Sequence, residues 1–286
     1  MTRRHRRDAH APWWQHLLAL LVVIVFLAPF AWLAIASITP AGALLDRPLR
    51  WWPKTLDLSR WSAIATGGAA TPAGGFRQAM INSTIVALGT VALSLTVAVL
   101  GGYALSRLRF RGHRMVLLGF LSTYMMPPIA IVIPLYLILV QFGLLDSKIG
   151  LILVYSSFIT PFVLWTLTGF FDTLPRELDE AATVDGAGRL RILVQVLLPL
   201  CRPGIFSAVL FASLLCWDEF LYALIFTSSS SSKTIPVAVA EFSGKFSTDF
   251  GLVSAGGLLA ALPPVIVALI FQRHIAAGLA AGAVKG

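Results

Sequence analysis

Leu17–Ile38 reads LLALLVVIVFLAPFAWLAIASI, an apolar run without a charged side chain. About 20 such residues are enough to cross the hydrocarbon core of a bilayer as a helix. Basic residues between Arg3 and Arg7 precede the run, and Ala34–Ala36 resembles a signal-peptide cleavage site. The apolar part of a signal peptide is shorter, roughly 7–15 residues, so we predict an uncleaved first span.

The rest of the chain repeats this pattern. Hydrophobic residues make up 57% of the chain and charged residues 12%, with a mean hydropathy of +0.83. Soluble domains carry about 25% charged residues, so lipid must solvate much of this chain. We therefore predict an all-α membrane protein with six transmembrane helices, of which the later five are Ser83–Leu105, Met115–Val140, Ile149–Phe171, Gly204–Phe226 and Leu252–Phe271. Pro127-Pro128 and Pro263-Pro264 fall inside spans, where proline bends a helix.

The placement of arginine and lysine predicts the orientation. Basic residues are enriched at 1–16, at 107–114 and between the fourth and fifth spans, which the positive-inside bias assigns to the cytoplasm. We expect both termini in the cytoplasm, with residues 1–16 as a basic N-terminus, 17–271 as the transmembrane domain and 272–286 as a C-terminal tail. Because the formal charge of +9 is explained by these flanks, no nucleic-acid partner is predicted.

The longest predicted external loop, residues 39–78, holds Trp51, Trp52 and Trp61. They fit either an interfacial aromatic belt or a docking surface for an external partner. A second external segment, Ser228–Ser232, is predicted to be a flexible polar turn. Cys201 and Cys216 have no metal-ligand spacing, and no metal or cofactor site is predicted.

Asp172–Pro203 mixes acidic and basic residues at the inner face and predicts a helix-turn-helix. Thr173 is a candidate cap and Pro175 suits the first turn of a helix over 175–184. Its acids, Glu177, Asp179 and Glu180, favour a helix N-terminus. Gly186 is expected to end this helix, and Pro199 to end a second one over 189–198.

Leu178, Ala181 and Ala182 lie at helical spacing and predict one small apolar face. Alanine side chains permit close approach, so this helix could lie in a shallow cleft of another protein, with Glu180 fixing the register. An ordinary amphipathic surface helix would show the same periodicity.

The same residues resemble the EAA signature of permease subunits in binding-protein-dependent ABC importers. The matching positions are Glu180-Ala181-Ala182, Gly186, Val196 and Leu198-Pro199, at the spacing of the signature, with Val196 in place of Ile. Asp185-Gly186-Ala187 resembles the form found in carbohydrate importers. Further likenesses to that subfamily, including the smaller permease of maltose-type transporters, are Asn82-Ser83-Thr84 and Trp217-Asp218-Glu219-Phe220, although Asp218 stands where Asn is commoner.

The resemblance implies partners: two ATPase subunits, a second permease and an external solute-binding protein. It implies uptake of a sugar or related polyol, of the oligosaccharide or glycerol-phosphate type, by alternating access. ATP and Mg would be used by the ATPase, and this chain would have no catalytic residue and no cofactor of its own. The residues implied in ATPase coupling are Glu180, Ala181, Ala182, Asp185, Gly186, Leu198 and Pro199.

Asp218 and Glu219 are acids inside an apolar segment, where acids are costly and often functional. With Trp217 and Asn82 they could line the pathway or hold helices at an interface, and the sequence leaves both open. Two other classes of membrane protein have different sequence features. An ion-gradient secondary transporter would usually show internal repeats, and a polytopic membrane enzyme a catalytic constellation; neither is evident.

Overall fold

A computed structural model describes residues 13–46, 48, 51–67, 72–108, 110–243 and 248–283. Most of the predicted basic N-terminus, Arg109 and residues 284–286 lie outside the described residues. The regular secondary structure of the described part is helical, apart from an isolated β-bridge between Ser243 and Thr248. Four of its helices are long and apolar enough to cross a membrane: α1 (Trp13–Ser37), α3 (Pro72–Arg107), α6 (Lys148–Thr173) and α13 (Phe250–Ala283). These confirm the first, second, fourth and sixth predicted spans.

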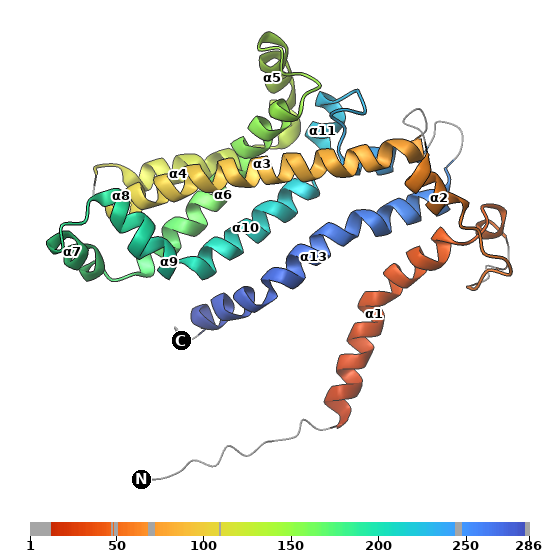
Figure 1. The fold of residues 1–286 in the computed structure, drawn as a ribbon, viewed down its shortest axis with the longest axis horizontal. Coiled ribbons are helices and arrows are strands. Elements are labelled where there is room, and N and C mark those ends of the chain that lie inside the picture. The colour runs from red at the N-terminus through yellow and green to blue at the C-terminus, as the bar shows by residue number, and fades with distance from the viewer. Residues whose placement is uncertain are drawn as a thin grey trace.

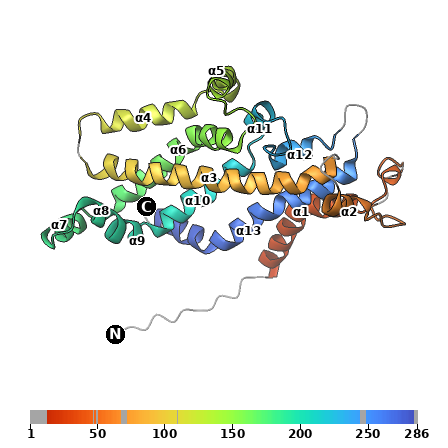
Figure 2. The ribbon, with the colours of Figure 1, turned by 45° about the horizontal axis from the view of Figure 1, so that its top comes forward.

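The two other predicted spans are broken. α4 (His113–Tyr124) and α5 (Pro128–Gln141) meet at 96°. Figure 2 shows α4 running along α3 while α5 is seen nearly end-on. Pro127 is extended, with φ −64° and ψ 128°, and Pro128 opens α5. Because a proline disfavours the helical conformation of the residue before it, this pair breaks the span instead of bending it slightly.

The fifth predicted span also ends early, because α10 (Arg202–Trp217) stops three residues before α11 (Leu221–Phe226). Before α10, the short helices α8 (Arg189–Ile192), η2 (Leu193–Leu197, a π-helical turn) and α9 (Leu198–Leu200) form one arm that meets α10 at 81°. The described residues thus contain up to six spans if each bent pair crosses as one.

α3 and α6 form the centre of the bundle. They pack along most of their length, with Gly89 so close to Ile152 that a Cβ at position 89 would lie 2.6 Å from its Cδ1 atom. Tyr155, Leu167 and Phe171 of α6 are fully buried in this core. α10 and α13 cover one side of the pair, and α4 lies against α6 (Figure 1).

α1 stands apart from this bundle over most of its length and packs mainly against α13, near its own C-terminal end (Figure 1). Its only buried residues are Ala36 and Ser37. Side chains of this helix from Trp13 to Phe30 are exposed, as suits a helix that faces lipid or another subunit.

One end of the bundle gathers η1 (Gly42–Leu44), α2 (Ser59–Thr66), α11, α12 (Ile235–Ala240) and the first turns of α3. We call this the α2 end. The predicted loop 39–78 is shorter than expected because α3 already begins at Pro72. Trp61 is half-buried against a second apolar core, whereas Trp51 and Trp52 are about 70% exposed. The opposite end carries α7 (Glu177–Val184), α8 and α9, and we call it the α7 end.

Candidate functional site

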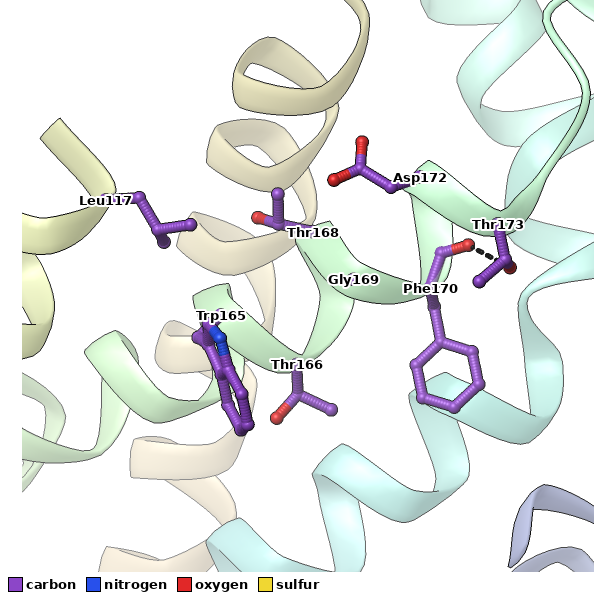
Figure 3. Close-up of a pocket in the computed structure, with 8 residues that line it drawn as sticks. All are labelled: Leu117, Trp165, Thr166, Thr168, Gly169, Phe170, Asp172 and Thr173. Atoms are coloured by element: carbon purple, nitrogen blue, oxygen red, sulfur yellow. Dashed lines mark hydrogen bonds between the residues drawn. The ribbon is translucent and has the colours of Figure 1, made fainter. Parts of the chain in front are cut away.

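α7 begins at Glu177, two residues after Pro175, and carries three acids in its first turn. Thr173 does not cap it as predicted: it belongs to the last turn of α6, where its hydroxyl donates to the Phe170 carbonyl (Figure 3). Arg176 is the N-cap residue and makes no side-chain cap hydrogen bond. The exposed acids Glu177 and Glu180 therefore act on this N-terminus through the helix dipole.

The two faces of α7 differ from the predicted ones. Ala182 packs against the core of the bundle and Leu178 is half-buried, but Ala181 is exposed. The predicted face of Leu178, Ala181 and Ala182 is therefore divided between the two sides of the helix. Its outward face consists of four exposed residues at helical spacing: Glu177, Glu180, Ala181 and Val184, the last of them 88% exposed. We call this set the outward face.

Gly186 ends α7 in the left-handed conformation, with φ +78°. Its N–H donates to Thr183 O at 3.0 Å, and the N–H of Ala187 donates to Ala182 O at 2.9 Å. These two bonds form a Schellman motif, in which glycine is favoured because a side chain would strain the backbone. Asp185, which precedes Gly186, is exposed.

The second helical arm continues two residues beyond its predicted end, to Leu200. Pro199 lies inside α9, and the break follows at Cys201. Because proline has no N–H to donate to the carbonyl four residues earlier, the ladder is interrupted at Gln195, within the π-helical turn η2. Leu197 is fully buried and Leu198 packs half-buried on the core, so Leu198-Pro199 joins the arm to α10.

Sequence reasoning missed a set of contacts between α7 and the end of α3. Arg107 Nε lies 3.0 Å from Asp179 Oδ2, and both side chains are largely buried. Arg107 could be found in the sequence only as a basic residue at the end of a span, and Asp179 only as an acid in the first turn of a helix. Nothing local in the sequence predicts that they meet.

The predicted pathway or interface residues separate in the structure. Asn82 is fully buried and donates hydrogen bonds to the carbonyls of Ser230 and Lys233 at the α2 end. Trp217 Nε1 donates to Ala260 O of α13 at 3.0 Å. The Glu219 carboxylate accepts from the N–H groups of Tyr222 at 2.9 Å and Ala223 at 3.2 Å, and so caps α11.

Asp218 alone of these four residues is exposed. It lies at a cleft of about 430 Å³ at the break between α10 and α11, lined by Phe211, Leu214, Leu215, Trp217, Asp218, Glu219 and Pro264. An exposed carboxylate beside aromatic and aliphatic side chains can accept hydrogen bonds from a polar molecule that enters this cleft.

A second cleft, of about 390 Å³, lies between α4 and α6 near the α7 end. Figure 3 shows Trp165 and Thr166 on one side, Leu117 of α4 across from Thr168, and Asp172 at the far rim. Apart from Asp172, these residues fall within predicted spans, and the sequence does not distinguish them from lipid-facing positions. Trp165 is 52% exposed, which the apolarity of the segment does not indicate.

Comparison with known proteins identifies relatives over nearly the whole chain. A family model described as "Binding-protein-dependent transport system inner membrane component" matches residues 91–280. The trehalose transport system permease protein SugB of Mycobacterium tuberculosis is 35% identical over 278 residues, covering 96% of this chain and 98% of its own length. The diacetylchitobiose uptake system permease protein DasC of Streptomyces coelicolor is 33% identical over 273 residues, covering 96% and 97%.

A solved structure has the same fold. It is the crystal structure of a bacterial ABC transporter involved in the import of the acidic polysaccharide alginate. One of its chains aligns with a TM-score of 0.77 and 21% identity, over 91% of this chain and 95% of that one.

Proposed function

The chain belongs to the family of binding-protein-dependent transport system inner membrane components, and from this membership we propose that it carries a sugar or related polyol across the membrane. It is a non-catalytic permease subunit of an importer, located in the inner membrane, and the ATPase is a separate subunit. The sugar assignment is carried by one observation: relatives that match 96% of this chain are permeases for trehalose and for diacetylchitobiose.

The α7 end faces the cytoplasm in this proposal, and the α2 end faces outward. Arg107, Arg111, Arg114 and Arg176 lie in or beside the α3–α4 and α6–α7 connections at the α7 end, as the positive-inside bias requires. α1 then begins in the cytoplasm and α13 ends there. Residues 1–16 and 272–286 flank the transmembrane domain 17–271 on the cytoplasmic side. The predicted external loop 39–78, which α3 shortens to 39–71, meets the solute-binding protein.

Asp172–Pro203 is the coupling loop in this proposal, with α7 as the helix that docks in a groove of the ATPase. The outward face offers Glu180 and Ala181 to that groove, and Ala182 holds the helix to the bundle. Asp185 and Gly186 form the turn that ends the helix. Leu198 and Pro199 connect its second arm to α10, so a displacement of α7 reaches a span directly.

The transport cycle follows from this arrangement. ATP closes the ATPase dimer, the docked helices move with it, and the spans alternate between inward- and outward-facing states. The solute-binding protein delivers its sugar to the outward-facing cavity formed with a second permease. ATP and Mg bind to the ATPase subunits and not to this chain.

Of the four candidate pathway or interface residues, Asp218 is the one whose side chain is free to contact a solute or the second permease. The side chains of Asn82, Trp217 and Glu219 are already hydrogen-bonded to other residues of this chain.

The proposal is tested by purifying the tagged full-length chain from native membranes in mild detergent and identifying what stays bound. We expect an ATPase and a second permease. Uptake of radiolabelled trehalose, maltose and diacetylchitobiose is then measured in cells with and without the chain. A chain that purifies alone in several detergents, and whose deletion leaves all three uptakes unchanged, contradicts the proposal.

The outward face is tested with Glu180→Lys. We expect uptake to fall at least tenfold while the chain still inserts in the membrane, because the reversed charge opposes docking. Glu241→Lys is the matched control, since it makes the same change at an exposed acid of the α2 end, away from α7. Equal uptake by the two variants would contradict a specific role for Glu180.

A further inference from the structure

The last residue of α3 is tied to the N-terminal part of α7. The Arg107 Nε atom lies 3.0 Å from Asp179 Oδ2, and the side chains are 6% and 21% exposed. Arg107 Nη2 also donates to the Leu174 carbonyl at 3.1 Å. The ion pair with Asp179 and the Nη2 hydrogen bond to Leu174 come from one guanidinium group, so one side chain holds both the carboxylate of α7 and the backbone that leads into it.

The neighbouring residue of α3 makes a second set of contacts to the same segment. Ser106 Oγ donates to Asp172 Oδ1 at 2.5 Å, and Arg176 Nη2 donates to the Ser106 carbonyl at 3.1 Å. The end of α3 therefore contacts the segment from Asp172 to Asp179 at four points. Donors and acceptors come from both partners, which fixes the distance and the rotation of α7 relative to α3.

The acids of the first turn of α7 divide between its two sides. Glu177 and Glu180 belong to the outward face, whereas Asp179 turns toward the bundle and Arg107. A largely buried guanidinium is stable only with a charged or hydrogen-bonding partner. Removal of the Asp179 carboxylate should therefore weaken the attachment of α7 to α3 without altering the outward face.

We propose that Arg107 and Asp179 are positioning residues that make α7 and α3 move as one body. This inference rests on the proposed coupling function of α7. α3 packs along α6 for most of its length, so a displacement of α7 by the ATPase passes through Arg107 into both central spans. The pair acts on transmission and not on docking, because neither side chain lies on the outward face.

The test uses the full transporter complex and a labelled sugar that the wild type takes up. Arg107→Asp, Asp179→Arg and the combined charge swap are compared for three properties: ATPase retained on purification, ATP hydrolysis, and sugar uptake. We expect each single variant to keep its ATPase and to lose tenfold or more in sugar transported per ATP hydrolysed. The swap should recover at least a third of the wild-type ratio. Lys233→Glu, in the exposed pair with Glu241 at the α2 end, should stay within twofold of wild type.

Milder variants cover the case in which a charge reversal prevents insertion. Arg107→Lys keeps the charge but cannot hold Asp179 and Leu174 together, and Asp179→Asn keeps the shape. Both should lower the transport ratio severalfold. Wild-type ratios in these variants, or a swap no better than the single reversals, would overturn the proposal. A wild-type chain that retains no ATPase would instead overturn the proposed function, and this inference with it.

Discussion

The Asn82 side chain joins two segments that are 148 residues apart in sequence. Its Nδ2 atom donates to Ser230 O and to Lys233 O, both at 2.9 Å, and its Oδ1 atom accepts from Gln78 at 3.0 Å. This fully buried amide attaches the turn between α11 and α12 to the outer part of α3. The turn predicted to be flexible, Ser228–Ser232, is therefore held in place on this side.

Asn82→Ala should destabilise the protein by about 2 kcal/mol, because it removes the three hydrogen bonds of a fully buried amide. The measurement is the thermal midpoint of the purified chain in detergent. Thr84→Ala is the control on the same helix, since the Thr84 hydroxyl is exposed and bonds only to its own helix. Equal midpoints for the two variants would show that the Asn82 hydrogen bonds do not stabilise the fold.

Asp146 holds the other side of the same turn. Burial by itself raises the pKa of its carboxyl, but hydrogen bonds from Ser228, Ser232 and Ser229 outweigh burial and bring the pKa well below its ordinary value. A carboxyl with a lowered pKa stabilises the fold above its unfolded-state pKa, about 3.9 for aspartate. That stabilisation is lost as the pH falls below this value.

Asp146→Asn should therefore lower the thermal midpoint at pH 7, and the difference from wild type should narrow below about pH 4. Asparagine keeps the backbone unstrained, since residue 146 has φ 54° and asparagine tolerates that conformation. The midpoint is measured from pH 7 to pH 3 for both proteins. Asp57→Asn is the control, because Asp57 accepts from Ser59 on an exposed loop. A difference that stays constant with pH would contradict the prediction.

The sequence was sufficient for the features that depend on local pattern. The apolar runs predicted α1, α3, α6 and α13, because each is long enough to span a bilayer by itself. The sequence indicates that the third and fifth predicted spans are disturbed, but not that each is broken into separate helices. Pro127-Pro128 ends α4 instead of bending one helix, and Glu219 caps a new helix instead of lying within a span.

The contacts that organise the candidate site could not be predicted in this way. Arg107 with Asp179 and Asn82 with Ser230 join residues that are far apart in the chain, so no periodicity or capping rule connects them. The residues that form the outward face of α7 could not be identified from the sequence either. Apolarity assigned Ala181 to the inner side together with Ala182, but the position of α7 on the end of α3 exposes Ala181.

Gly186→Val should uncouple uptake from ATP hydrolysis. A side chain at φ +78° costs roughly 1–2 kcal/mol, which is enough to open the Schellman turn and rotate α7 but not to unfold the spans. We expect normal membrane insertion, ATP hydrolysis by the complex that is retained, and at least a tenfold loss of uptake. Gly188→Ala is the matched control, because Gly188 has φ −72° and nothing within 4 Å of an added Cβ. Normal uptake by Gly186→Val would contradict a role for this turn.

Glu219 and Asp218 are adjacent acids with different expected roles. Glu219→Ala removes the acceptor for the Tyr222 and Ala223 N–H groups, and loss of such a cap costs about 1 kcal/mol. Asp218→Asn changes only an exposed carboxylate at the cleft beside Pro264, so it should leave the thermal midpoint unchanged. The two midpoints are measured on purified protein, and sugar uptake is measured in cells. If Asp218 meets the solute or the second permease, Asp218→Asn alters uptake or permease retention at constant stability. If both variants lower the midpoint equally, Asp218 stabilises the chain as Glu219 does, and it has no separate role at the cleft.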